Sequence, residues 1–392
     1  MKKAILLSAL FMLTMTAAAQ NRSIEFHHGS FAELLAKAKA EKKMIYIDCY
    51  TTWCGPCKWM AKNVFTNDTA ADFYNANFVN AKIDMEKGEG IELAQKYSIQ
   101  AYPTMLFLDA NGVQLHRTCG SSPAAAFINS GKEALSPNTQ LATYAANFNA
   151  GKASAPDAAR YFSMLQNACQ SYGNEVNHYF TTVGKEDLSS RANWNIIYRY
   201  VEDYNSAVFT GFEADKDLYM KKYGKDSVEN KINQVYNNGL FSAIENKDMK
   251  SYEIIKGKMR MAKTEHTEMI ILGADIKLAQ RSGDWKTYAS LASGYVEKYS
   301  SSDKNDLNSF AWAFYEHVDD KAMLEKAESW SKKATELDDN YAYNDTYAAV
   351  LYKLGKRKEA KAAAQKAIGI AKKNGEDYRE TAALLDKIEA LK

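Results

Sequence analysis

The stretch Trp53-Cys54-Gly55-Pro56-Cys57-Lys58 decides the fold and the chemistry expected of this chain. An apolar, β-favouring run at residues 44–50 predicts a buried strand before it, and residues 57–65 predict a helix after it. Cys54 is therefore expected at a helix N-terminus, where N–H groups without helical partners and the helix dipole favour the thiolate. The two-residue spacer brings Cys57 within bonding distance of Cys54, so that Cys57 can resolve a mixed disulfide formed at Cys54.

Two other interpretations of a Cys-x-x-Cys pair are half a zinc site and a plain structural disulfide. A zinc site needs a second pair of ligands, and the sequence supplies none, because the other cysteines are dispersed and the six histidines are single apart from one adjacent pair. Five cysteines scattered over 392 residues do not resemble a disulfide scaffold. We therefore favour a redox-active dithiol, with no metal and no cofactor apart from the Cys54–Cys57 disulfide.

The three remaining cysteines are expected to be ordinary thiols. Cys49 follows Asp48 on a strand, so its side chain should point to the opposite face and pack as a small hydrophobe. Cys119 lies on a later strand, and a Cys49–Cys119 bond is not expected because it would have to span the intervening sheet. Cys169 is expected in a helical segment, buried.

Residues 26–134 alternate between helical and strand-like hydrophobic periods. Ser30 and Glu33 match a capping box that opens a helix to about residue 42. Asn111-Gly112 predicts a tight hairpin between two strands. The predicted strands are residues 44–50, 78–84, 104–108 and 113–119, and the predicted helices after the first two are residues 68–75, 91–97 and a closing helix from about residue 123. The pattern is α/β with a terminal antiparallel hairpin.

From residue 136 onward the strand signals vanish, and amphipathic helical segments alternate with short turns. Ala327 and Ala334 recur as Ala360 and Ala367, close to the roughly 34-residue period of tetratricopeptide repeats. We predict an all-α, tetratricopeptide-like domain at residues 136–392, with a less regular helical bundle as the alternative. The α/β domain is placed at residues 20–135.

The first 19 residues read as a secretory signal peptide: two lysines, an apolar run, and small residues before a cut that leaves Gln20 first. The alternative is an uncleaved anchor. After cleavage we expect no membrane span and an exported, periplasmic location. The formal net charge of +2 arises from balanced charges without a basic stripe, so it gives no support for nucleic-acid binding.

The residues around the cysteines resemble the thioredoxin superfamily over about residues 26–134. Trp53 to Lys58 match its active-site signature, and Asp48 lies six residues before Cys54, where thioredoxins carry a buried acid. Pro103 matches the loop proline that adopts a cis peptide, and Gly120 matches the glycine after the last strand. The resemblance implies a central mixed sheet flanked by helices.

The resemblance also implies roles for the site residues. Cys54 would be the nucleophile and the more exposed sulfur, and Cys57 the resolving thiol, deprotonated with help from Asp48, whose pKa burial should raise. Trp53, Tyr102 and Pro103 would bind the substrate segment.

Two positions depart from the family pattern. Tyr102 stands where thioredoxins often carry Ile. The lysine that pairs with the buried acid could be Lys82, but Asn80 aligns about as well.

Two functional hypotheses follow. The first is an exported protein thiol–disulfide oxidoreductase, a reductase or isomerase, whose helical domain docks the client or a partner. Its partners would be exported proteins with disulfides or thiols and a membrane electron donor. The second is a protein-binding helical module that uses the thioredoxin-like domain as a platform.

Overall fold

The computed structural model describes residues 22–184 and 187–390. The contacts within the chain divide it into two compact units, the first ending at Val201 and the second beginning at Glu202. The first unit joins the α/β part to the helices that follow it directly. The domain limits at residues 20–135 and 136–392 stay predictions, and the predicted signal peptide lies outside the described residues.

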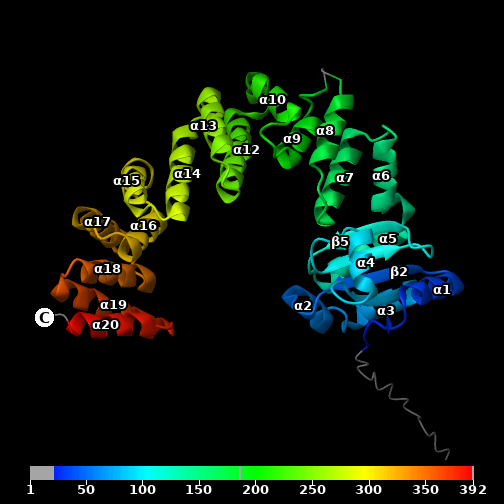
Figure 1. Cartoon of the computed structure of the whole chain (residues 1–392), viewed down its shortest axis with the longest axis horizontal. Coiled ribbons are helices and arrows are strands. Elements are labelled where there is room, and N and C mark those ends of the chain that lie inside the picture. Colours follow the sequence, from blue (N-terminus) through cyan, green and yellow to red (C-terminus); the bar gives the residue numbers. More distant parts are fainter. Residues whose placement is uncertain (1–21, 185–186, 391–392) are drawn as a thin grey trace, which may run out of the picture. The chain divides into compact units, whose positions relative to one another are not determined.

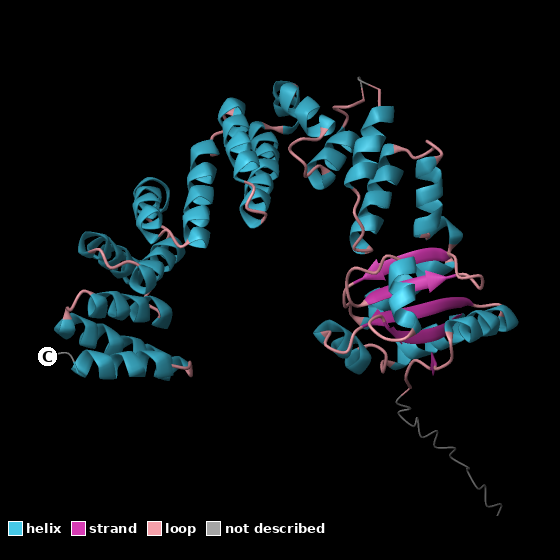
Figure 2. Ribbon diagram, in the orientation of Figure 1, coloured by secondary structure: helices cyan, strands magenta, loops and turns pink. Residues whose placement is uncertain are grey.

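A five-stranded mixed sheet forms the centre of the first unit (Figures 1 and 2). Its strands, in the spatial order β1-β3-β2-β4-β5, are β1 (Phe26–His27), β3 (Phe78–Asp84), β2 (Met44–Tyr50), β4 (Thr104–Leu108) and β5 (Gln114–Cys119). The first three are parallel, whereas β4 runs antiparallel to β2 and β5 antiparallel to β4. The hairpin turn at Asn111-Gly112 is present, and Gly112 takes the positive φ of 81° that such a turn requires.

Helices cover both faces of this sheet. They are α1 (Phe31–Glu41), α2 (Gly55–Asn63), α3 (Asp68–Asn77), α4 (Glu89–Lys96) and α5 (Ala124–Leu135). Side chains alternate along each strand, so Tyr46 packs beneath α2, α3 and α5, whereas Ile45 and Ile47 pack beneath α1 and α4. The predicted capping box of Ser30 and Glu33 opens α1. The α/β prediction is confirmed.

The part after α5 is helical, and the structure describes no strand there. The first unit continues with α6 (Leu141–Asn149), α7 (Ala155–Asn167), α8 (Gly173–Thr182) and α9 (Arg191–Tyr200). The second unit contains α10 (Ala207–Ala214), α11 (Lys216–Tyr223), α12 (Lys225–Glu245), α13 (Met249–Ala262), α14 (Thr267–Ser282), α15 (Trp285–Tyr295), α16 (Lys304–His317), α17 (Lys321–Leu337), α18 (Tyr341–Lys353), α19 (Arg357–Asn374) and α20 (Arg379–Ala390).

The recurring alanines lie at the helix contacts. Ala327 and Ala334 lie on α17, Ala360 and Ala367 on α19, and all four are fully buried. Small side chains there let neighbouring helices approach closely. The all-helical prediction is confirmed, and the tetratricopeptide-like repeat stays a prediction.

Candidate active site

Cys54 and Cys57 form a disulfide at the N-terminus of α2, with their Cα atoms 5.3 Å apart. Cys54 is the N-cap of this helix, and its Sγ accepts a hydrogen bond of 3.0 Å from the backbone N–H of Cys57. Helix N–H groups and the helix dipole therefore act on the Cys54 sulfur, as its position in the sequence suggested. The expected difference in exposure is wrong for this oxidised state. Each cysteine is 2% exposed, because the disulfide and the N-cap bond hold the Cys54 sulfur against the first helical turn.

Asp48 is fully buried on β2, on the face of the sheet that α2 covers. Burial raises the pKa of its carboxyl group to about 6, and Lys82 opposes this rise. The Lys82 Nζ lies 3.3 Å from Asp48 Oδ2, while within the described residues neither carboxylate oxygen accepts a well-formed hydrogen bond. Asp48 therefore combines a nearby positive charge with almost complete desolvation.

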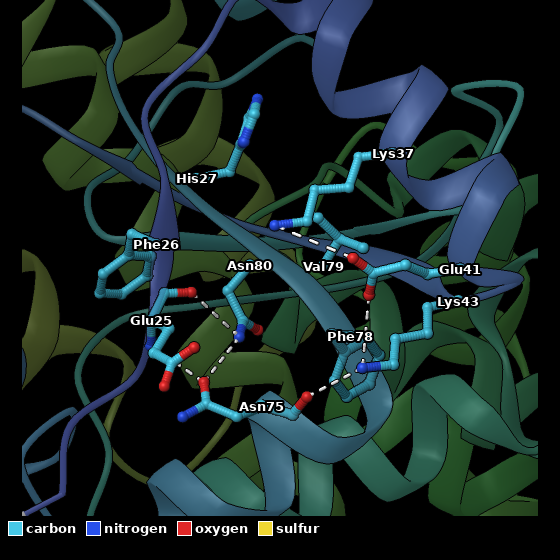
Figure 3. A pocket seen from close by; sticks show the side chains of 10 residues that line it. All are labelled: Glu25, Phe26, His27, Lys37, Glu41, Lys43, Asn75, Phe78, Val79 and Asn80. Carbon is cyan, nitrogen blue, oxygen red and sulfur yellow. Dashed lines mark hydrogen bonds and ion pairs between the residues drawn. The ribbon is translucent and has the colours of Figure 1, made fainter.

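The strand register decides which residue accompanies Asp48. In the parallel β2–β3 ladder Asp48 is paired with Lys82, whereas Asn80 is paired with Tyr46. Asn80 instead donates from its amide to Asn75 Oδ1 at 3.1 Å, in a polar cavity of about 270 Å³ at the β1 edge of the sheet (Figure 3). Lys82 is thus the partner of the acid.

The peptide bond between Tyr102 and Pro103 is cis. The carbonyl oxygen of Pro103 accepts a hydrogen bond of 2.8 Å from the N–H of Gly120, which ties this loop to the end of β5. The ring of Tyr102 packs edge-on against that of Trp53, with centroids 6.0 Å apart. Trp53 is 65% exposed, so it offers an apolar surface beside the cysteines.

Glu86 is a site residue that the sequence analysis missed. The indole Nε1 of Trp53 donates to both carboxylate oxygens of Glu86, each at 3.0 Å. The only signal for it in the sequence is an acid two residues after the end of a predicted strand, which is too common to single it out.

The prediction for Cys49 is confirmed. It is fully buried on the face opposite Asp48, belongs to no disulfide, and burial raises the pKa of its thiol far above the ordinary value.

Cys119 lies on β5 as expected, but the expectation that Cys119 and Cys169 are ordinary thiols is wrong. The two form a disulfide, and Cys169 lies exposed in the turn after α7 rather than buried in a helix. They come together because α6 and α7 pack against the β5 edge, a long-range contact that no local pattern encodes.

Among the described residues, no group of three or more His, Cys, Asp or Glu side chains is placed to hold a metal ion. The disulfide is part of the chain and is not a cofactor. None of the helices in the described residues is long and apolar enough to cross a membrane.

Comparisons with known proteins agree with this geometry. The thioredoxin family model matches residues 23–133. Thioredoxin-1 of Drosophila melanogaster is 42% identical over 72 residues, which are 18% of this chain and 63% of that protein. Thioredoxin-1 of Saccharomyces cerevisiae is 38% identical over 91 residues, 22% of this chain and 79% of that protein.

Among solved structures, a putative disulphide-isomerase from Bacteroides thetaiotaomicron is 45% identical, covering 30% of this chain and 97% of that one, with a TM-score of 0.28. The residues that the family model matches are those of the α/β part. The chain therefore belongs to the thioredoxin family, and its Cys54–Cys57 pair is that of a protein thiol–disulfide oxidoreductase.

Proposed function

We propose that this protein is an exported reductase or isomerase of protein disulfides, and that its helical part docks the client. One observation carries the proposal: a Cys-x-x-Cys disulfide stands at the N-terminus of α2, and the sheet face that α2 covers carries the buried Asp48, with Lys82 Nζ 3.3 Å from its carboxylate. A structural platform would not need a buried carboxylate whose pKa burial raises to about 6, because a buried charge destabilises the fold.

The reaction uses the reduced dithiol. The Cys54 thiolate attacks one sulfur of the client disulfide, and the other client sulfur leaves as a thiolate that takes up a proton. Cys57 then gives its proton to the Asp48 carboxylate and attacks the Cys54 sulfur. The Cys54–Cys57 bond forms, the bond to the client breaks, and the client leaves with both sulfurs reduced. Two electrons pass from the dithiol to the client.

Asp48 suits the role of proton acceptor because its pKa, about 6, lies close to neutral pH. Lys82 keeps the carboxylate charged often enough to act as a base, since its ammonium group lies 3.3 Å from Oδ2. Asp48 would therefore take the proton of Cys57 and return it to solvent between turnovers.

Trp53, Tyr102 and Pro103 would bind the client segment next to its disulfide. The two aromatic rings meet beside the cysteines, and Glu86 holds the indole in place through its hydrogen bonds. Tyr102, where thioredoxins often carry Ile, adds a hydroxyl group to this surface and so would change which segments bind best.

Export rests on residues 1–19, whose lysines, apolar run and small residues match a secretory signal. In a bacterial periplasm, exported proteins with disulfides would be the clients, and a membrane protein would restore the dithiol. Fractionation of cells that express the chain with and without residues 1–19 tests this, and mature protein beginning at Gln20 is expected only for the full chain.

A groove in the second unit supports client docking. It has a volume of about 380 Å³ and lies on α12 and α14, next to Tyr295 of α15. Its lining residues are all uncharged: Asn230, Asn233, Gln234, Asn237, Phe241, Met269, Ile270, Gly273, Ala274 and Tyr295. Side-chain amides can both donate to and accept from main-chain groups, so the groove suits an extended, unfolded polypeptide segment better than a charged ligand.

The redox potential of the Cys54–Cys57 pair tests the enzymatic proposal. Glutathione titration with tryptophan fluorescence should give a reversible two-electron transition nearer to about −270 mV, typical of reducing thioredoxins, than to about −120 mV. The Cys54→Ser variant is the control and should lack the transition of the Cys54–Cys57 pair. A potential above about −180 mV would overturn the reductase assignment, and no transition in the wild type would overturn the enzymatic function.

A further inference from the structure

The second disulfide joins two parts of the first unit that are 50 residues apart in sequence. Cys119 ends β5, at the edge of the sheet, and Cys169 lies in the turn after α7 with a left-handed φ of 51°. Their Cα atoms are 5.9 Å apart, which falls within the range of about 4.4–6.8 Å found for disulfides.

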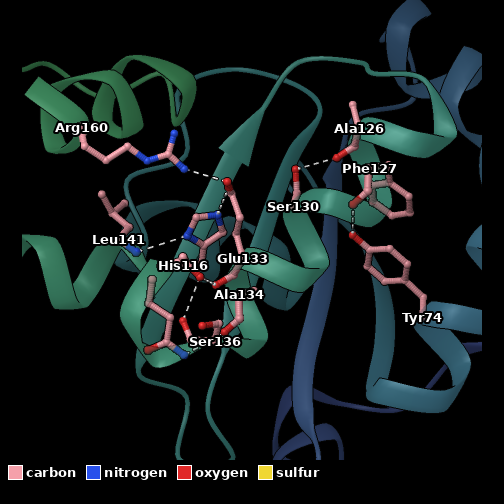
Figure 4. A network of polar contacts seen from close by, with 12 residues as sticks. Tyr74, His116, Ala126, Phe127, Ser130, Glu133, Ala134, Ser136, Leu141 and Arg160 are labelled. Atoms are coloured by element: carbon pink, nitrogen blue, oxygen red, sulfur yellow. Dashed lines mark hydrogen bonds and ion pairs between the residues drawn. The ribbon is translucent and has the colours of Figure 1, made fainter.

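Polar contacts also join β5 to α6 and α5 to α7 (Figure 4). His116 of β5 accepts a hydrogen bond of 3.2 Å at Nδ1 from the N–H of Leu141, the first residue of α6. Arg160 of α7 forms an ion pair of 2.7 Å with Glu133 of α5. The disulfide is thus a covalent link between elements that a hydrogen bond and a partly exposed ion pair also join.

The disulfide also lies next to the loop proposed to bind the client. Cys119 is paired with Thr104 in the β4–β5 ladder, and Thr104 directly follows the cis Pro103. Gly120, directly after Cys119, donates to the Pro103 carbonyl oxygen at 2.8 Å. A shift of Cys119 would therefore displace the Pro103 loop through Thr104 and Gly120.

Cys119 and Cys169 differ from Cys49 in exposure. Cys169 is exposed and Cys119 is half-buried, whereas Cys49 is 0% exposed. Attack on a disulfide needs a path for the incoming thiolate, and exposed disulfides are the more easily reduced ones. The Cys119–Cys169 bond is therefore open to a dithiol, through the Cys169 side.

We propose that Cys119–Cys169 is a second redox-active pair, which fastens the α7–α8 turn to the sheet edge when oxidised and releases it when reduced. The reductant is a dithiol, such as the reduced Cys54–Cys57 pair of a second copy, so this source rests on the function proposed above. Its first thiolate attacks Cys169 and frees Cys119 as a thiol. Its second sulfur then displaces Cys169, so the dithiol becomes a disulfide and two electrons reach the Cys119–Cys169 pair.

The test uses the full chain carrying Cys54→Ser and Cys57→Ser, so that it does not depend on the proposed reductase activity. The protein is equilibrated in glutathione buffers of increasing reducing strength, alkylated and analysed by mass spectrometry. We expect one two-electron transition at residues 119 and 169 while the protein remains folded. The same chain with Cys49→Ser added is the matched control and should show the same transition.

Hydrogen exchange of the oxidised and reduced forms tests the release. On reduction, the exchange rates of amides in α7 (Ala155–Asn167) should rise at least about tenfold, while those in α19 (Arg357–Asn374) of the second unit stay constant. Three results would each overturn the proposal: no 119–169 disulfide in the oxidised protein, a pair that stays oxidised until the protein unfolds, or reduction without a change in α7 exchange.

Discussion

Replacing Asp48 by asparagine should stabilise the sheet at alkaline pH, although it removes the ion pair with Lys82. Burial raises the pKa of Asp48 from 3.8 to about 6, so the folded state binds the proton more tightly than the unfolded state does. The free energy of unfolding therefore falls as the pH rises from 3.8 to about 6, and the destabilisation by the buried carboxylate charge is complete above pH 6. One pKa unit corresponds to about 1.4 kcal/mol, which puts the cost of the buried charge at about 3 kcal/mol.

The asparagine side chain of the Asp48→Asn variant is neutral at every pH, so the variant lacks this cost. Its free energy of unfolding should exceed that of the wild type by about 3 kcal/mol at pH 8 but by only about 0.5 kcal/mol at pH 4. Hydrogen exchange of the amides in β2 and β4, followed by mass spectrometry, measures this for the sheet alone. The control Asp72→Asn, at a side chain that is 49% exposed, should leave exchange unchanged at both pH values.

Two results would refute this reasoning. An equal gain in the free energy of unfolding at both pH values would mean that Asp48 destabilises the sheet through packing and not through its charge. A loss of stability at pH 8 would mean that Lys82 more than offsets the desolvation of the carboxylate. Turnover provides a separate check: Asp48→Asn should slow release of the mixed disulfide by roughly 10²-fold, because Cys57 loses its proton acceptor.

Three further predictions concern other sites. Lys82→Met removes the cation that stabilises the Asp48 carboxylate, so the acidic limb of the pH–rate profile should move to higher pH; an unmoved limb would remove Lys82 from proton handling. Burial lowers the pKa of His116 to about 4, so the free energy of unfolding should fall by up to about 3 kcal/mol as the pH falls from 6.5 to 4. In the His116→Gln variant, hydrogen exchange of the β5 amides should lack this acid dependence. The double variant Asn230→Ala, Asn237→Ala should bind a reduced, unfolded polypeptide more weakly than the wild type, as measured by fluorescence anisotropy. Equal affinity would exclude this groove as the docking site. A peptide with N-methylated main-chain groups is the control and should bind both proteins equally weakly.

Protonation of Asp48 and protonation of His116 have opposite effects on the stability of the sheet. Between pH 4 and 6, protonation of Asp48 favours the folded state and protonation of His116 favours the unfolded state. The wild-type sheet should therefore show a weaker pH dependence in this range than Asp48→Asn or His116→Gln.

Much of the α/β part could be predicted from local signals. The Ser30–Glu33 capping box sets the start of α1, and the runs at Met44–Tyr50 and Phe78–Asp84 form β2 and β3 at the predicted residues. Such signals act over a few residues, through hydrogen bonds to the nearest N–H groups and through side-chain periodicity. The Cys54–Cys57 pair is equally local, since its spacer alone brings the two sulfurs together.

Other features depend on contacts between distant segments, which no local pattern encodes. Lys82, and not Asn80, accompanies Asp48 because the register of two parallel strands decides which side chains are neighbours. The Cys119–Cys169 disulfide depends on how α6 and α7 pack against the sheet edge, 50 residues being far too long a separation for the cysteine spacing to predict the pair. The sequence by itself determined the chemistry of the first disulfide, and only the tertiary structure decided the acid's partner and the existence of the second.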